Sequence, residues 1–131
     1  LSKGDDLLKR LSGLAKEQEV SVIASMHNFK ETPSGEEMYE TLTHMEEYAD
    51  IAKIAVMPNI EEDVLTLLTV SARAKKELSI PFITISMGKL GAVSRICGET
   101  FGSCITFGAG TDASAPGQIP ATQLRKILEL L

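Results

Sequence analysis

The sequence has 131 residues, 44% hydrophobic and 24% charged, and its 13 Lys and Arg against 18 Asp and Glu give a formal net charge of −5. This composition is typical of a folded domain and excludes a disordered chain, which combines low hydrophobicity with high net charge. No apolar run reaches the roughly 20 residues that span a bilayer. The charges form no basic face of the kind that binds nucleic acid. The length allows one domain but excludes a complete eight-stranded α/β barrel, which needs roughly 250 residues.

Four short apolar runs predict buried strands. They cover residues 20–26, 51–57, 81–87 and 103–107. Each run is nearly continuous rather than alternating, which is typical of strands covered on both faces of a parallel sheet. The first three begin at residues 20, 51 and 81, a regular spacing for strand–helix units.

Helical patterns lie before, between and after these runs. The first covers residues 5–19, with an apolar stripe formed by Leu7, Leu8, Leu11, Leu14 and Ala15. The second places Met38, Leu42, Met45 and Ala49 on one face, and Ser34 with Glu37 three residues later is a capping-box signature.

Three more helices complete the pattern. The third is expected over residues 61–78 with Asn59 as its cap, a shorter one over 90–99, and the last over 120–131, opening on Pro120. A helix followed by four strand–helix pairs predicts right-handed crossovers and a parallel sheet, so the fold class is α/β.

Lys53 is the most informative single residue, because it lies inside the apolar run Ile-Ala-Lys-Ile-Ala-Val. Lysine is rarely buried without a partner or a function. Desolvation lowers the pKa of such an amine and makes it a nucleophile toward carbonyl groups. The alternative is an edge position from which the side chain reaches water, and the pattern alone does not choose between the two.

Other candidate residues follow the predicted strands, where parallel α/β folds carry their sites. His27 follows the first strand; it is either a structural histidine or an acid/base beside the lysine. Arg95 suits a bidentate grip on a carboxylate or a surface salt bridge. His44 lies among glutamates on a helix and is predicted to face solvent without a role. Cys97 and Cys104 are interpreted as buried thiols of a reducing cytosol.

Five motifs taken together resemble type I 3-dehydroquinate dehydratase of the shikimate pathway. They are Ser-Met-His-Asn-Phe at 25–29, Lys-Ile-Ala-Val-Met-Pro at 53–58, Ser-Met-Gly at 86–88, Ser-Arg at 94–95, and Phe-Gly-Ser at 101–103 with Ser-Ala-Pro-Gly-Gln at 114–118. The resemblance runs from about residue 20 to the end of the sequence. It implies that residues 1–131 are the C-terminal half of one (β/α)8 TIM-barrel domain with about four parallel strands.

The resemblance also implies a chemistry. Lys53 matches the lysine that forms a Schiff base with 3-dehydroquinate, and His27 matches the general acid/base. Arg95, Ser114 and Gln118 match substrate-binding positions, with Arg95 on the carboxylate, and Met87 and Phe29 match residues that line the pocket. The family needs no metal or cofactor. The resemblance also implies a cytoplasmic homodimer that acts on a small molecule and has no nucleic-acid or membrane partners.

Two departures from the family leave alternatives open. Asn28 stands where the family more often has aspartate. The acidic residue that orients the histidine, with further substrate-binding groups, belongs to the first half of the family's barrel, which the chain should need. The alternatives are an inactive half-barrel or assembly fragment, and another Schiff-base enzyme of the class I aldolase type.

Overall fold

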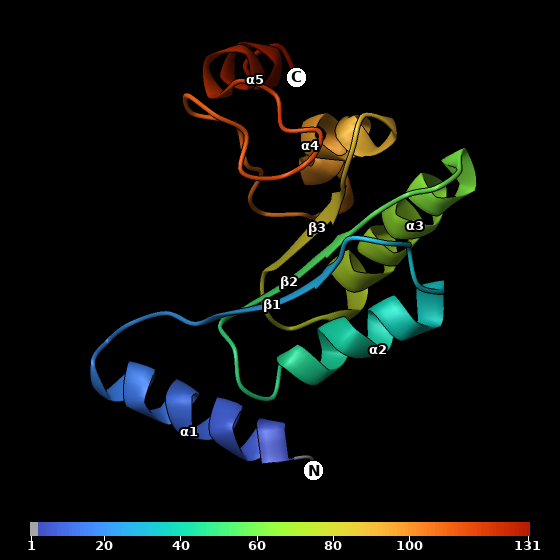
Figure 1. The fold of residues 1–131 in the computed structure, drawn as a ribbon. Coiled ribbons are helices and arrows are strands. Elements are labelled where there is room, and N and C mark those ends of the chain that lie inside the picture. The colour runs from blue at the N-terminus through green and yellow to red at the C-terminus, as the bar shows by residue number, and fades with distance from the viewer. Residues whose placement is uncertain (1–2) are drawn as a thin grey trace.

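Apolar strands alternate with amphipathic helices along the chain, and the three strands pair in chain order as one parallel sheet (Figure 1). The computed structural model describes residues 3–131. Its elements are α1 (Lys3–Glu17), β1 (Ile23–Asn28), α2 (Gly35–Met45), β2 (Ile51–Val56), α3 (Glu61–Glu77), β3 (Phe82–Ser86), η1 (Leu90–Ala92), α4 (Val93–Cys97), η2 (Gly98–Phe101) and α5 (Ala121–Leu128). No helix within this part of the chain is both long and apolar enough to cross a membrane.

β2 is the central strand, and its register fixes which residues share a row of the sheet. Lys53 pairs with Ser25 on one side and Ile83 on the other, and Ala55 pairs with His27 and Ile85. Side chains alternate between the two faces of a strand. Lys53 and His27 therefore project from the same face, two residues apart in the register.

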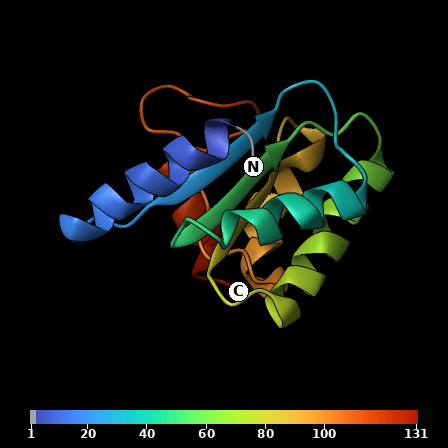
Figure 2. The same ribbon diagram turned by 90° about the horizontal axis from the view of Figure 1, so that it is seen from below.

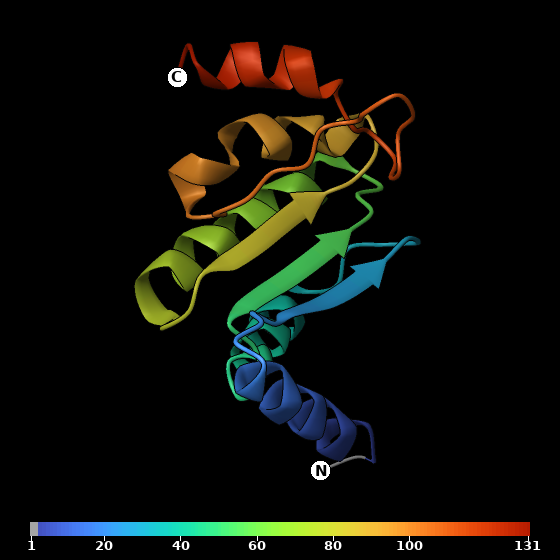
Figure 3. The ribbon, with the colours of Figure 1, turned by 90° about the vertical axis from the view of Figure 1, so that its left-hand side faces the viewer.

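α2 and α3 cover the opposite face and form the main core with it (Figures 2 and 3). The buried residues of this core are Met38, Leu42, Met45, Ala52, Ile54, Val56, Leu67, Val70, Ala74 and Phe82. The capping box predicted for α2 is confirmed, because Ser34 and Glu37 bond each other's backbone amides. A smaller cluster of Ala55, Ile83, Ile85 and Met87 lies on the face that carries Lys53, and Figure 3 shows no helix in front of that face.

The fourth predicted strand, residues 103–107, is wrong. This segment joins β3 only through an isolated bridge between Phe82 and Ser103. Beyond it the chain is held to α4, where Thr106 Oγ1 donates to the carbonyl of Arg95 (3.0 Å). The apolar composition suits a strand, but a strand also needs a continuous series of backbone hydrogen bonds to its neighbour. This segment leaves β3 after a single bridge. The described sheet thus has three strands rather than four.

The cap expected at Asn59 is also wrong. The carboxylate of Asp63 accepts from the amides of Asn59 (2.7 Å) and Ile60 (3.2 Å) and closes the start of α3. The side chain of Asn59 is left free for another partner, and it donates to the carbonyl of Lys30 (3.3 Å).

α1 turns its polar face to the rest of the molecule and its apolar stripe outward. Lys9 pairs with Glu47 (2.9 Å), and Asp5 lies 3.3 Å from His44 Nε2. His44 therefore links α1 to α2, and its side chain is 42% exposed, in agreement with the solvent-facing position predicted for it. The leucines of the stripe remain 41–58% exposed, and Figure 1 shows the helix set apart from the sheet.

The α3 core supplies a test of this architecture. Leu67 is fully buried, whereas Leu65, two positions earlier on the same helix, is 62% exposed. We expect Leu67→Ala to lower the free energy of unfolding by about 2–5 kcal/mol, because it removes apolar contacts and leaves a cavity. The matched Leu65→Ala change should stay within about 0.5 kcal/mol. Urea unfolding measures both, and equal effects would contradict the assigned packing.

Candidate active site

A cavity of about 260 Å³ opens at the C-terminal ends of the strands, on the sheet face without helices. All seven site residues predicted from the sequence line it: His27, Phe29, Lys53, Met87, Arg95, Ser114 and Gln118. They come from β1, β2, α4 and the segments that follow β1, β3 and η2. Residues spread over 92 positions of sequence, from 27 to 118, thus share one small volume.

Lys53 occupies the centre of the sheet rather than an edge, which removes the alternative of a lysine that escapes to water from an edge strand. Its Nζ lies 4.4 Å from the centroid of the Phe107 ring. Partial burial, and secondly the positive charge of Arg95, lower the pKa of this amine below its ordinary value. A lowered pKa increases the fraction of neutral amine, which is the nucleophilic form.

His27 lies at the end of β1 with its ring stacked on Phe29. The ring centroids are 5.8 Å apart and the planes are 10° from parallel. Desolvation, with a smaller effect of the Lys53 charge, lowers the pKa of His27. A histidine with a lowered pKa is neutral at pH 7 and is ready to accept a proton.

Arg95 is only 2% exposed, although it carries a charge. Its two terminal nitrogens donate to the carbonyls of Phe107 (3.3 Å) and Pro116 (3.1 Å), while its Nε has no partner. No acidic side chain within residues 3–131 pairs with it. A buried guanidinium without a counter-charge is suited to an anionic ligand.

Ser94 holds the start of α4 against the end of β3 and so places its neighbour Arg95. Its hydroxyl accepts from the amide of Ser86 (2.9 Å) and lies 2.8 Å from the carbonyl of Gly91, to which it can donate. Gly91 packs so closely that an added Cβ atom would overlap the backbone of Ser86. These contacts fix the backbone position from which the Arg95 side chain reaches the cavity.

The segment from Ser114 to Gln118 forms a closed turn over the cavity. Gln118 Oε1 accepts from the amide of Ser114 (2.8 Å), and its Nε2 donates to the Ser114 hydroxyl (3.0 Å). The amide of Gly88 donates to the carbonyl of Pro116 (3.1 Å). Gly117 has φ +73°, and a Cβ atom there would collide with the carbonyl of Gly88. The turn is thus pressed directly onto the chain that leaves β3.

Two groups of the site were missed in the sequence. The Phe107 ring contacts Lys53 and its carbonyl accepts from Arg95, and the carbonyl of Pro116 is the second acceptor for Arg95. Phe107 ends the fourth apolar run, so the rule that sites follow strand ends could have found it. A backbone carbonyl such as that of Pro116 leaves no signal in residue type.

The electrostatics of the cavity are one-sided. His27, Lys53 and Arg95 all carry or can carry positive charge, and none of the lining residues is Asp or Glu. Within residues 3–131 no cluster of three His, Cys, Asp or Glu side chains is placed to hold a metal ion. The arrangement therefore suits a small anionic carbonyl compound, with an amine to attack it and an imidazole to move its protons.

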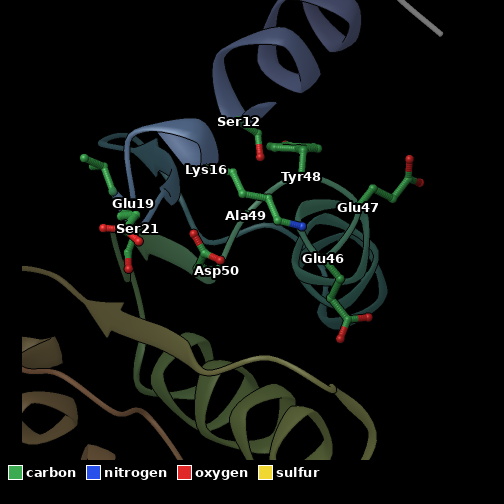
Figure 4. Close-up of a pocket in the computed structure, with 10 residues that line it drawn as sticks. Ser12, Lys16, Glu19, Ser21, Glu46, Glu47, Tyr48, Ala49 and Asp50 are labelled. Carbon is green, nitrogen blue, oxygen red and sulfur yellow. The ribbon is translucent and has the colours of Figure 1, made fainter. Parts of the chain in front are cut away.

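A second pocket of about 380 Å³ lies between α1 and the segment that follows α2. Figure 4 shows Ser12 close to Tyr48 and the side chain of Lys16 between Tyr48 and Asp50. This pocket is at the N-terminal ends of β1 and β2, the end opposite to the one where parallel α/β folds carry their chemistry. None of the residues predicted from the sequence lines it.

Comparison with known proteins gives a consistent result. Residues 1–131 match the family model for type I 3-dehydroquinase. The chain is 49% identical over 133 aligned residues to the 3-dehydroquinate dehydratases of Salmonella paratyphi B and Salmonella typhimurium. All of this chain is covered in these alignments, but only 53% of each relative, so the chain spans about half their length.

Solved structures agree with the sequence matches. The 3-dehydroquinate dehydratase of Geobacillus kaustophilus superposes with a TM-score of 0.93 at 44% identity, covering 95% of this chain and 49% of that one. The type I enzyme of Clostridium difficile, solved with covalently modified comenic acid, gives a TM-score of 0.91 at 45% identity, covering 96% and 50%.

The Lys53 amine near the imidazole makes the titration of His27 a test of the site. In an NMR titration we expect the pKa of His27 to lie below the ordinary histidine value of about 6.5. Lys53→Met should raise this pKa by removing a positive charge, without restoring it fully because desolvation has the larger effect. Lys76→Met, on α3 behind the sheet, is the matched control. An unchanged His27 pKa in Lys53→Met would contradict the described juxtaposition.

Proposed function

Because this chain belongs to the type I 3-dehydroquinase family, we propose that it provides the catalytic groups of a 3-dehydroquinate dehydratase. The reaction removes water from 3-dehydroquinate to give 3-dehydroshikimate. The convergence of Lys53, His27 and Arg95 on one cavity is the observation that carries the proposal. An amine, an imidazole and an unpaired guanidinium are the groups that a lysine-dependent dehydration of a carboxylated ketone needs.

Covalent chemistry begins at Lys53. Its neutral amine adds to the C3 carbonyl of the substrate and, with loss of water, leaves a protonated imine that withdraws electrons from C2. His27 takes the C2 proton, and the electrons of that C–H bond form an enamine. The lowered pKa values of both groups support these roles, since each must be neutral when it begins to act.

Elimination then uses the same imidazole in its protonated form. The enamine expels the C1 hydroxyl, which takes a proton from His27 and leaves as water, and hydrolysis of the imine frees Lys53. One group thus serves as base and then as acid, which suits a histidine. The covalently modified ligand in the Clostridium difficile relative is in keeping with a nucleophilic residue in the family.

The remaining residues bind the substrate. Arg95 receives its carboxylate, since the guanidinium is buried and no acid among residues 3–131 pairs with it. Ser114 and Gln118, now bonded to each other, exchange that bond for substrate hydroxyls. Met87 is buried beneath the cavity and Phe29 stands beside His27, so both shape the pocket wall.

The working enzyme needs the half of the barrel that the relatives have in addition. β1 has an unpaired edge, the leucine stripe of α1 faces solvent, and no carboxylate among the cavity-lining residues can orient His27. A second candidate function follows from the same observations. These 131 residues by themselves are an assembly module that holds the catalytic side chains but does not turn over substrate.

A dimeric, cytoplasmic enzyme acting on a small molecule is part of the same proposal. Cys97 is half-buried and Cys104 is exposed, rather than both being buried as expected, and their free thiols are in keeping with a reducing compartment. Sedimentation equilibrium of the active enzyme tests the dimer, and a mass of one protomer would contradict it.

Trapping of the imine tests the nucleophile. With 3-dehydroquinate and borohydride, the active enzyme should gain a reduced adduct that peptide mass spectrometry places on Lys53. Lys53→Ala should abolish both adduct and turnover. Lys89→Ala, which removes an exposed lysine outside the cavity, should leave both unchanged.

The same trap separates the two candidate functions. If residues 1–131 form the adduct only together with the rest of the barrel, they act as an assembly module when alone. Full turnover by the isolated 131 residues would refute the need for the other half. An adduct on a lysine other than Lys53 would refute the assigned mechanism.

His27 is tested by separating adduct formation from turnover. We expect His27→Ala to form the Lys53 adduct while kcat falls by about 10²–10⁴-fold, the usual contribution of a general acid/base. His44→Ala, at the contact between α1 and α2, is the control and should keep its turnover. Normal kcat in His27→Ala would exclude the histidine as the proton carrier.

A further inference from the structure

Asn28 lies between two residues of the site without lining the cavity itself. His27 and Phe29 both border the cavity, and the alternation along β1 sends the Asn28 side chain to the other face of the sheet. Its Oδ1 accepts from the amides of Lys30 (3.0 Å) and Glu31 (3.1 Å). An Asn side chain that bonds the backbone two and three residues later closes a tight turn.

This turn places the Phe29 ring. Phe29 is 59% exposed, so little packing holds it in position, yet its ring is stacked on the imidazole of His27 within 10° of parallel. The backbone on both sides of Phe29 must therefore set the direction of the ring. The chain before it is fixed by the β1–β2 ladder, and the chain after it is fixed by the Asn28 oxygen.

The turn is also tied to the strand that carries Lys53. Asn59, beyond the end of β2, donates to the carbonyl of Lys30 (3.3 Å). Thr32 donates to the carbonyl of Met57 (3.0 Å). The loop after β1 and the loop after β2 are therefore one hydrogen-bonded unit, which keeps His27 and Lys53 in register at the mouth of the cavity.

We propose that Asn28 is a positioning residue, whose side-chain oxygen holds the Phe29 ring against His27, so that position 28 requires an acceptor rather than a charge. Both of its partners are neutral amides, and asparagine and aspartate supply the same oxygen to them. Asn28 thus replaces the more frequent aspartate of the family without loss of the turn. The effect on turnover rests on the proposed role of His27, whereas the effect on ring stacking does not.

Two variants of the intact protein separate the acceptor from the charge. Asn28→Ala removes the oxygen, and Asn28→Asp keeps it and adds a negative charge. A stacked aromatic ring shifts the NMR signals of the imidazole protons of His27, and Phe29→Ala gives the position of these signals without stacking. We expect Asn28→Ala to move them to that position and to lower kcat about tenfold, whereas Asn28→Asp keeps the stacked signals and stays within about threefold in kcat.

His44 gives an internal control for folding, because its ring contacts Tyr48 at the far end of the strands (5.6 Å between centroids). Its signals should be unchanged in each variant. If Asn28→Ala disturbs His44 as well, Asn28→Asp carries the test, and loss of its stacked signals would overturn the proposal. Stacked signals in a folded Asn28→Ala protein would also overturn it. If the NMR results are as expected but the unmodified enzyme forms no Lys53 adduct, the proposed function fails while the placement of Phe29 stands.

Discussion

The two-residue alternation of β2 is the constraint on which the rest of the structure depends. Ala52, Ile54 and Val56 point to the helices and close the main core, while Lys53 and Ala55 point to the other face. The strand has no freedom to rotate, because a shift by one residue would put the lysine into the core. Burial of these three apolar side chains therefore presents one amine at a fixed depth in the cavity, beside the imidazole that β1 places two residues further along the register.

Charge is concentrated where the sheet leaves a face open. Burial, and secondly the charge of Arg95, lowers the pKa of Lys53. Burial, and secondly the charge of Lys53, lowers the pKa of His27, and none of the residues that line the cavity is a carboxylate. Such a set of cationic groups destabilises itself, so an anionic ligand relieves repulsion as well as making hydrogen bonds. The uncompensated positive charge that makes the site costly to fold also makes it selective for anionic ligands.

The sequence allowed much of this architecture to be predicted, and each failure has its own physical cause. Lys53 and His27 could be found because they interrupt or end apolar runs. The core under the helices could be predicted because the apolar residues of each helix, such as Leu42 in α2 and Leu67 in α3, recur at helical spacing and share one face. The strand predicted at residues 103–107 did not form, because an apolar composition does not say which partner a segment meets. The cap predicted at Asn59 did not form because the helix begins one residue later, with Ile60 at the cap position, and the Asp63 carboxylate accepts from the amides of Asn59 and Ile60.

The contact of Gly117 with Gly88 has a consequence for how this fold can vary. Gly88 itself has φ +70°, and its backbone leaves no room for a Cβ atom on Gly117. The turn that carries Ser114 and Gln118 therefore cannot be lengthened or exchanged while the end of β3 stays unchanged. The turn and the end of β3 therefore vary together: a substitution at one must be matched by a change at the other, almost thirty residues away in the chain.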